Sequence, residues 1–240
     1  MAQLYYRYST MNAGKSIDVL KTYHNYMEQG KAAVLFTSAL ENRFGTGVVA
    51  SRIGLQEKAI LFDGGTDFHA LVAYMLDQGL HINCVLVDEA QFLTAAQVSQ
   101  LTDIVDECGI PVIAYGLKTD SRSQLFEGSA ALLCEADKLE ELKTVCWFCD
   151  RKATKNMRVD DGRPVFDGPQ IAIGDNANKA STASVAYFPV CRRCYKAMKR
   201  SSVLPDIPDP DVPKLKRQLD EAIGRLYTSY QAERGQESHG

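Results

Sequence analysis

The chain has 240 residues, of which 45% are hydrophobic and 24% are charged, so it can bury a sizeable core. This composition excludes disorder over the whole chain. The formal net charge of −3 argues against a broad nucleic-acid surface but is compatible with a small anionic ligand. No apolar run approaches the roughly 18 residues of a membrane span, and the first residues lack a signal-peptide pattern. We therefore expect a cytoplasmic protein with no membrane partner.

The first half of the chain alternates short apolar runs with helical patterns. Apolar runs typical of buried parallel strands lie at residues 4–8, 32–37, 84–87 and 110–115. Apolar residues at helical spacing cover 17–27, 68–78 and 95–108, and Thr94 is a suitable N-cap for the last of these. This alternation predicts an α/β fold with a parallel sheet.

After about residue 142 the pattern changes. Two pairs of cysteines flank a stretch rich in Gly, Asp, Asn and Ser, which predicts a small second module. A basic patch, the proline-rich segment PDIPDPDVP and a helical pattern over 214–231 follow, and they predict a linker with a loosely attached helix. We therefore divide the chain into residues 1–142, 143–198 and 199–240.

A phosphate-loop motif, STMNAGKS, occupies residues 9–16 between the first strand and the first helix. It matches the Walker A pattern except that Ser9 replaces the first glycine. Backbone N–H groups of the loop suit phosphate, Gly14 permits close approach, Lys15 reaches terminal phosphates and Ser16 can bind Mg²⁺. The alternative is a chance Gly-Lys-Ser turn, but the required strand precedes the motif and the required helix follows it.

A second motif, which is acidic, directly follows the strand predicted at residues 84–87. The sequence Val-Leu-Val-Asp-Glu resembles Walker B, in which the strand delivers Asp88 to the Mg²⁺ ion. Glu89 beside it can accept a proton from an attacking hydroxyl, which is water in an ATPase and an alcohol in a kinase. Taken alone, the pair could simply stabilise a helix N-terminus.

The sequence contains two CxxC pairs, Cys146 with Cys149 and Cys191 with Cys194. Four thiolates satisfy tetrahedral Zn²⁺ and leave no position for water, so we expect a structural zinc site, which the two pairs favour over a redox role. The other three cysteines are expected to be ordinary core or surface residues: Cys84, Cys108 and Cys134. Basic residues near the second pair suggest nucleic-acid binding, but the acidic total argues against it.

These motifs together resemble those of type II thymidine kinase, the zinc-containing family. The resemblance covers roughly residues 2–198 and rests on a short phosphate loop containing Met11, a Walker B strand ending Asp-Glu-Ala-Gln-Phe, and a C-terminal two-CxxC module. It implies a RecA-like P-loop domain, a zinc-ribbon domain carrying a lasso loop, and a homotetramer. It also implies transfer of the ATP γ-phosphate to the 5′-hydroxyl of thymidine or deoxyuridine, with Mg²⁺ as cofactor and dTTP as feedback inhibitor.

The same resemblance assigns site residues, with Glu89 as the catalytic base for the 5′-hydroxyl. The residues expected to bind ATP and Mg²⁺ are Ser9, Thr10, Met11, Asn12, Ala13, Gly14, Lys15, Ser16, Asp88 and Gln91. The residues expected to bind the nucleoside are Met11, Phe92, Leu117, Phe126, Ile171, Ala172, Ile173, Gly174 and Tyr187. Of these, the four lasso residues 171–174 would hydrogen-bond the base through their backbone. The side chains of the nucleoside set could also be ordinary core residues.

Three features depart from the family pattern, and the first is Ser9, which replaces a glycine found in many members and is tolerable because serine suits some bacterial forms. Ser121 stands where the family usually has an aromatic residue on the base, a loss of about 1 kcal/mol of stacking that Phe126 would partly offset. Asp175 replaces a second glycine in the lasso, and the segment that follows is longer than usual. Arg43 matches a family arginine and could be a structural ion-pair residue.

Two other functions fit parts of the pattern. A RecA-type ATPase would use Glu89 to activate water and would hydrolyse ATP without a nucleoside. A zinc-ribbon nucleic-acid adaptor would bind nucleic acid with a steep salt dependence and ignore ATP. The intact Lys15, Ser16, Asp88 and Glu89 count against the adaptor.

Overall fold

A computed structural model of the chain describes residues 1–40, 47–168, 170, 175–176, 185–205 and 212–237. Its contacts divide the chain into two compact units, Met1–Leu204 and Pro205–Gly240. None of the helices in these described segments has the length and apolar character that a membrane span needs.

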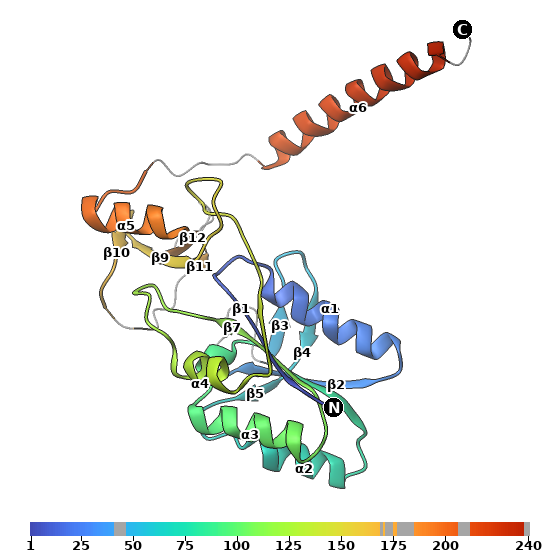
Figure 1. The fold of residues 1–240 in the computed structure, drawn as a ribbon, viewed down its shortest axis with the longest axis vertical. Coiled ribbons are helices and arrows are strands. Elements are labelled where there is room, and N and C mark those ends of the chain that lie inside the picture. The colour runs from blue at the N-terminus through green and yellow to red at the C-terminus, as the bar shows by residue number, and fades with distance from the viewer. Residues whose placement is uncertain (41–46, 169, 171–174, 177–184, 206–211, 238–240) are drawn as a thin grey trace. The chain divides into compact units, whose positions relative to one another are not determined.

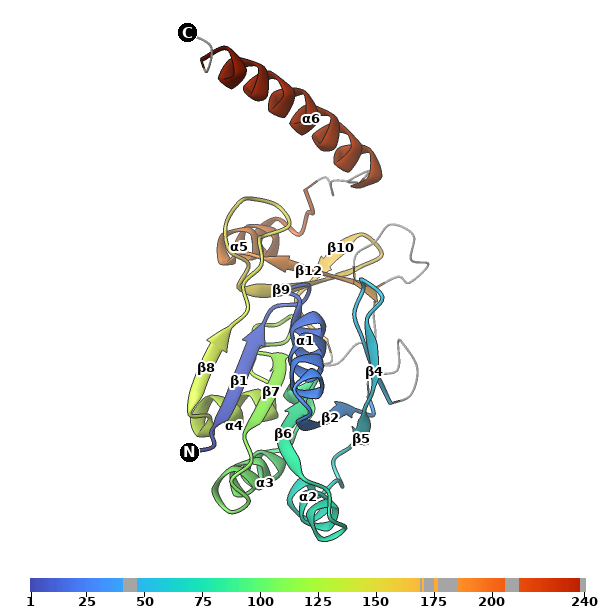
Figure 2. The ribbon, with the colours of Figure 1, turned by 90° about the vertical axis from the view of Figure 1, so that its right-hand side faces the viewer.

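The larger unit is built on a six-stranded sheet whose neighbouring strands all pair in parallel (Figure 2). The strands, from one edge to the other, are β5 (Ile60–Phe62), β2 (Ala32–Ser38), β6 (Ile82–Val87), β7 (Val112–Leu117), β1 (Leu4–Ser9) and β8 (Lys138–Glu141). All four predicted strands lie in this sheet, and the fold is the α/β, RecA-like domain that was expected. The strand predicted at 110–115 begins at Val112 in the structure, two residues later than predicted. Pro111 has no N–H to donate to the sheet.

Helices cover both faces of the sheet (Figure 1), which is why the two central strands, β6 and β7, are mostly apolar. Helix α1 (Lys15–Glu28) packs Val19 and Leu20 against one face, where β7 contributes Ile113 and Tyr115. The other face carries three helices, α2 (Phe68–Asp77), α3 (Ala95–Asp106) and α4 (Glu127–Glu135). The predicted N-cap Thr94 is confirmed, since it forms a capping box with Gln97.

Smaller elements were not predicted from the sequence. A hairpin joins β3 (Val48–Ala50) to β4 (Gln56–Lys58), and a 3₁₀ turn, η1 (Ala90–Phe92), follows the Walker B strand. Helix α4 also escaped prediction, because its first turn contains Gly128 and Ser129. These elements are short, so they depend on tertiary contacts more than on local sequence.

The cysteine-bearing part of this unit has its own sheet of four strands. Their order is β10 (Arg163–Val165), β9 (Lys155–Asp160), β12 (Val185–Val190) and β11 (Asp175–Asn176), and α5 (Arg192–Ser201) follows. This arrangement and the four cysteines fit the predicted zinc ribbon. The second unit contains α6 (Val212–Glu237), which confirms the helix expected over 214–231, while linker residues 206–211 lie outside the described residues.

The glycine at the start of α4 provides a test of this packing. A Cβ atom on Gly128 would lie 2.6 Å from the carbonyl oxygens of Ala90 and Leu93. We therefore expect Gly128→Ala to lower the free energy of unfolding by roughly 1–3 kcal/mol, measured by urea denaturation. Gly64→Ala is the control, because a Cβ atom there meets nothing within 4 Å. Equal stability of the two variants would contradict the close packing of α4 on η1.

Candidate active site

The segments that follow strands β1, β6 and β7 all lie at one edge of the parallel sheet. Ser9, at the end of β1, pairs with Leu117 at the end of β7, and Val87, at the end of β6, pairs with Ala114. The phosphate loop, the Walker B turn and the segment after β7 therefore leave the sheet at the same edge. This carboxyl edge is where ligands bind in open α/β sheets.

The phosphate loop closes around the lysine side chain. Lys15 is buried, and its Nζ atom lies 3.2 Å from Ser9 Oγ and 3.4 Å from the Thr10 carbonyl oxygen. The Ser9 hydroxyl donates to that same carbonyl at 2.7 Å, so it can accept from Lys15. Asn12 and Gly14 have positive φ angles of 60° and 81°, which turn the chain tightly before α1. The serine at the first Walker A position is therefore accommodated as part of the loop.

The two carboxylates of the Walker B turn, Asp88 and Glu89, have different surroundings. Asp88 is buried, and its N–H donates to the Phe36 carbonyl at 2.8 Å. Glu89 lies in the left-handed region, with φ 54° and ψ 35°, at a cost on the order of 1 kcal/mol that the surrounding contacts must offset. The side-chain amide of Gln91 donates to Glu89 Oε2. This bond orients the Glu89 carboxylate at the edge of the sheet.

Gln91 also fixes the end of β7. Its Oε1 atom accepts from the Leu117 N–H at 2.9 Å, and the side chain is buried. A Cβ atom on Gly116 would lie 2.9 Å from both the N and Oε1 atoms of Gln91, so this approach requires glycine. The Leu117 carbonyl accepts from Ser129 at 2.6 Å and from Tyr6 at 3.1 Å. The predicted ATP-site residue Gln91 thus lies inside the fold, between Glu89 and Leu117.

The predicted nucleoside residues lie on several elements. Phe92 and Phe126 pack edge to face with their ring centroids 6.0 Å apart, and Phe126 is buried. Tyr187 is buried on β12. The lasso residues 171–174 and Arg43 lie outside the described residues.

The departure at position 121 has a structural counterpart. Ser121 is buried, and its carbonyl accepts a 2.6 Å hydrogen bond from the Tyr195 hydroxyl on α5. The neighbouring Asp120 is also buried and binds the Arg122 guanidinium at 2.9 Å. The hydrogen bond from Tyr195 therefore anchors the turn at residues 120–122 to α5.

Sequence reasoning missed one buried residue that contacts the site. Asn156 on β9 accepts from the Met11 N–H at 2.8 Å and donates to the Thr119 carbonyl at 3.0 Å. A single asparagine within a strand gives no signal in the sequence for such a role. Its two partners lie on the phosphate loop and on the segment after β7.

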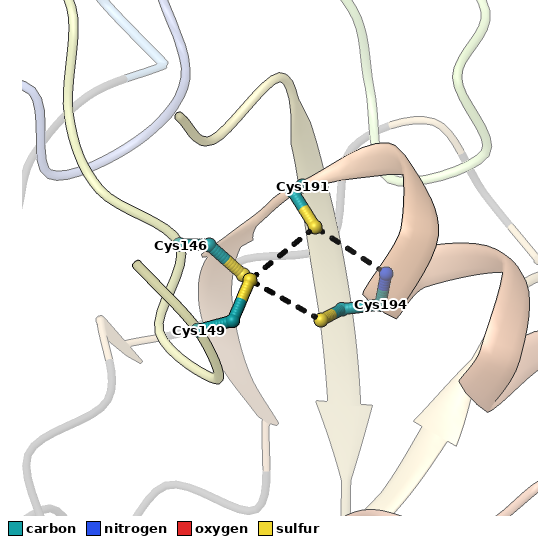
Figure 3. A group of neighbouring side chains, drawn as sticks. All are labelled: Cys146, Cys149, Cys191 and Cys194. Atoms are coloured by element: carbon teal, nitrogen blue, oxygen red, sulfur yellow. Dashed lines mark hydrogen bonds between the residues drawn. The ribbon is translucent and has the colours of Figure 1, made fainter. Parts of the chain in front are cut away.

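The four paired cysteines converge as predicted (Figure 3). Their sulfur atoms all lie within 4.8 Å of one another, and Cys149 Sγ is 3.7 Å from Cys191 Sγ and 3.8 Å from Cys194 Sγ. Zn–S bonds of about 2.3 Å in a tetrahedron give S···S separations of about 3.8 Å. The donor set therefore fits a structural Zn²⁺ ion.

Local hydrogen bonds and aromatic packing support this cluster. Burial acts to raise the pKa of Cys191, but hydrogen bonds, the Cys194 N–H foremost, lower that pKa to about 7. Such a thiol supplies thiolate readily near neutral pH. Trp147 and Phe148, between the first two cysteines, pack on Phe188 with centroids 5.4 and 5.9 Å away. The first CxxC turn is thereby held against β12.

Comparison with known proteins now decides the family. A family model described as "Thymidine kinase" matches residues 2–195. The chain belongs to the thymidine kinase family. It is 52% identical over 196 residues to a thymidine kinase of Listeria monocytogenes serotype 4b, a match covering 81% of this chain and 97% of that protein. Thymidine kinases of Lactiplantibacillus plantarum and Streptococcus gordonii are 51% and 50% identical, each over 81% of this chain and 96% of theirs.

Membership of the thymidine kinase family confirms the resemblance drawn from the motifs, and the four-cysteine cluster is consistent with its zinc-containing type. It also disfavours the two alternatives, a RecA-type ATPase and a nucleic-acid adaptor. The family match ends at residue 195, before the C-terminal unit.

Replacing one cysteine of the four-cysteine cluster tests whether it binds zinc. Cys149→Ser removes one of four thiolates, so we expect the purified variant to lose most of its bound zinc and to unfold at a lower temperature. Zinc content by atomic absorption and melting by circular dichroism would measure both effects. Cys134→Ser is the control, because Cys134 is exposed on α4. If wild-type protein contains no zinc, or if Cys149→Ser retains it fully, the assignment is wrong.

Proposed function

We propose that this chain is an ATP-dependent thymidine kinase, a transferase that moves the ATP γ-phosphate to the 5′-hydroxyl of thymidine or deoxyuridine. The observation that carries the proposal is the oriented carboxylate of Glu89 at the sheet edge that also bears the phosphate loop. A base and a phosphate cradle at one edge suit either hydrolysis or transfer. Membership of the thymidine kinase family favours transfer to a nucleoside.

In the proposed reaction, Glu89 accepts the proton of the 5′-hydroxyl as the oxygen attacks the γ-phosphorus, the bond from that phosphorus to the β,γ-bridging oxygen breaks, and ADP leaves. The phosphate-loop N–H groups and Lys15 stabilise the charge that develops on the phosphoryl oxygens. The hydrogen bond from Gln91 restricts the Glu89 carboxylate, so little reorientation is needed when the nucleoside binds.

Mg²⁺ would enter this site with ATP. Asp88 is a buried carboxylate at the end of β6, and Ser16 carries a hydroxyl in the first turn of α1. Oxygen ligands of this kind suit Mg²⁺, so we assign the ion to these two residues and the ATP phosphates. When bound, the ion neutralises negative charge on the β- and γ-phosphates.

We assign the nucleoside pocket to residues at the carboxyl edge of the six-stranded sheet and in the cysteine-bearing part of the chain. Met11, Leu117, Phe92 and Phe126 would supply apolar walls, as an uncharged base requires. Tyr187 would lie near the 5-methyl group and the deoxyribose, and the backbone of residues 171–174 would hydrogen-bond the base. With Ser121 in place of an aromatic residue, we assign the aromatic wall of this pocket to the Phe92–Phe126 pair.

Finer aspects of the proposal follow from the family. We assign ATP binding to residues 1–142, zinc and the lasso to 143–198, and a linker with a helix to 199–240. We further propose that the chain forms a homotetramer and is inhibited by dTTP. Sedimentation velocity and titration of the initial rate with dTTP test these two proposals separately.

Replacing the proposed base tests the reaction most simply. Glu89→Gln keeps the size of the side chain but cannot accept the proton, so we expect turnover to fall by about 10²–10⁴-fold. Binding of Mg-ATP should change little, because Lys15 and the loop are untouched. Thymidine monophosphate, quantified by chromatography, measures turnover.

The matched control is Glu28→Gln, which alters an exposed carboxylate at the end of α1. It should retain wild-type turnover. Near-normal activity of Glu89→Gln would exclude Glu89 as the base. Wild-type protein that makes no thymidine monophosphate would contradict the proposed function itself.

A further inference from the structure

Asn156 is a buried polar residue in the cysteine-bearing part of the chain. It lies on β9, seven residues after Cys149, and only 3% of its surface is exposed. Its backbone pairs with Pro189 on the neighbouring strand β12. The side chain leaves this small sheet and reaches two segments that follow strands of the six-stranded sheet.

The two ends of the Asn156 amide bind different segments. Oδ1 accepts from the Met11 N–H at 2.8 Å, and Nδ2 donates to the Thr119 carbonyl at 3.0 Å. The first partner belongs to the phosphate loop, and the second lies two residues beyond β7. One side chain therefore joins the loop after β1 to the segment after β7, and it does so from the small sheet.

The loop depends on this bond because of where Met11 lies. It stands between Thr10, whose carbonyl binds Ser9 and Lys15, and Asn12, which has a φ of 60°. The first half of the loop is thus held by the Ser9 and Lys15 contacts, and Met11 is held from outside by Asn156. Moving Met11 would shift the turn through Asn12 and Gly14 that presents the N–H groups to phosphate.

We propose that Asn156 is a positioning residue that sets the phosphate-loop conformation for ATP from the zinc-bearing part of the chain. The inference deepens the proposed function and rests on it for the identity of the phosphate donor. A residue needed only to fill space at this buried position could be apolar, since a buried amide is costly unless both of its ends are bonded. Both ends are bonded here, each to a main-chain group.

Two variants separate the two hydrogen bonds. Asn156→Ala removes both, whereas Asn156→Asp keeps an acceptor for the Met11 N–H and, when ionised, loses the donor to Thr119. Asn25→Ala, on the exposed surface of α1, is the matched control. For each protein, the Kd for a non-hydrolysable ATP analogue with Mg²⁺ is measured without thymidine, and KM for ATP is measured with it.

We expect Asn156→Ala to raise both the Kd for the analogue and KM for ATP by about tenfold, which corresponds to about 1.4 kcal/mol. Asn156→Asp should fall between this variant and wild type. Zinc content and the far-ultraviolet circular dichroism spectrum should match wild type in both variants. A residue with a merely structural role would lower the melting temperature and leave the Kd unchanged.

A wild-type Kd in folded, zinc-replete Asn156→Ala would overturn the inference. If Asn156→Ala fails to fold, Asn156→Leu decides, because leucine fills a similar volume but cannot accept from the Met11 N–H: weaker analogue binding supports the inference, and unchanged binding overturns it. Failure of the proposed function is distinguishable, because wild-type protein would then bind the analogue but make no thymidine monophosphate. Loss of analogue affinity in the variants would still support the role of Asn156 in the loop.

Discussion

The buried side chain of Gln91 is the contact on which the carboxyl edge of the sheet depends. It binds the carboxylate of Glu89 on one side and the backbone N–H of Leu117 on the other. Because the amide is buried, losing either partner would leave a polar group unsatisfied, at a cost of about 1–3 kcal/mol. The ends of β6 and β7 are therefore fixed to each other, and the proposed base is fixed with them.

Glycine makes this close packing possible. Gly116 lets the 3₁₀ turn approach β7, and Gly128 lets α4 approach the same turn. The cysteine-bearing part of the chain then meets the segment after β7 twice, through Asn156 of β9 on Thr119 and through Tyr195 of α5 on Ser121. Residues distant in the sequence thus converge on one edge, which carries the phosphate loop, the proposed base and a buried carboxylate, the kinds of group that phosphoryl transfer uses.

Much of this arrangement could be predicted from the sequence. The apolar runs predict the four central strands because both faces of the sheet are covered, and the phosphate loop and the cysteine pairs have spacings set by their chemistry. Strand β8, with the sequence KLEE, and helix α4, with Gly128 in its first turn, have no such local signal. The role of Asn156 could not be predicted either, because it depends on three segments meeting in space. The lasso assignment at residues 171–174 rests on the family resemblance alone.

The central claim is that Glu89 and the phosphate loop serve transfer to a nucleoside and not hydrolysis. The most direct measurement is ADP release from purified protein with Mg-ATP, with and without thymidine. The account predicts that ADP appears only with thymidine, together with an equal amount of thymidine monophosphate. ADP released at the same rate without thymidine would contradict it, since the activated oxygen would then be that of water.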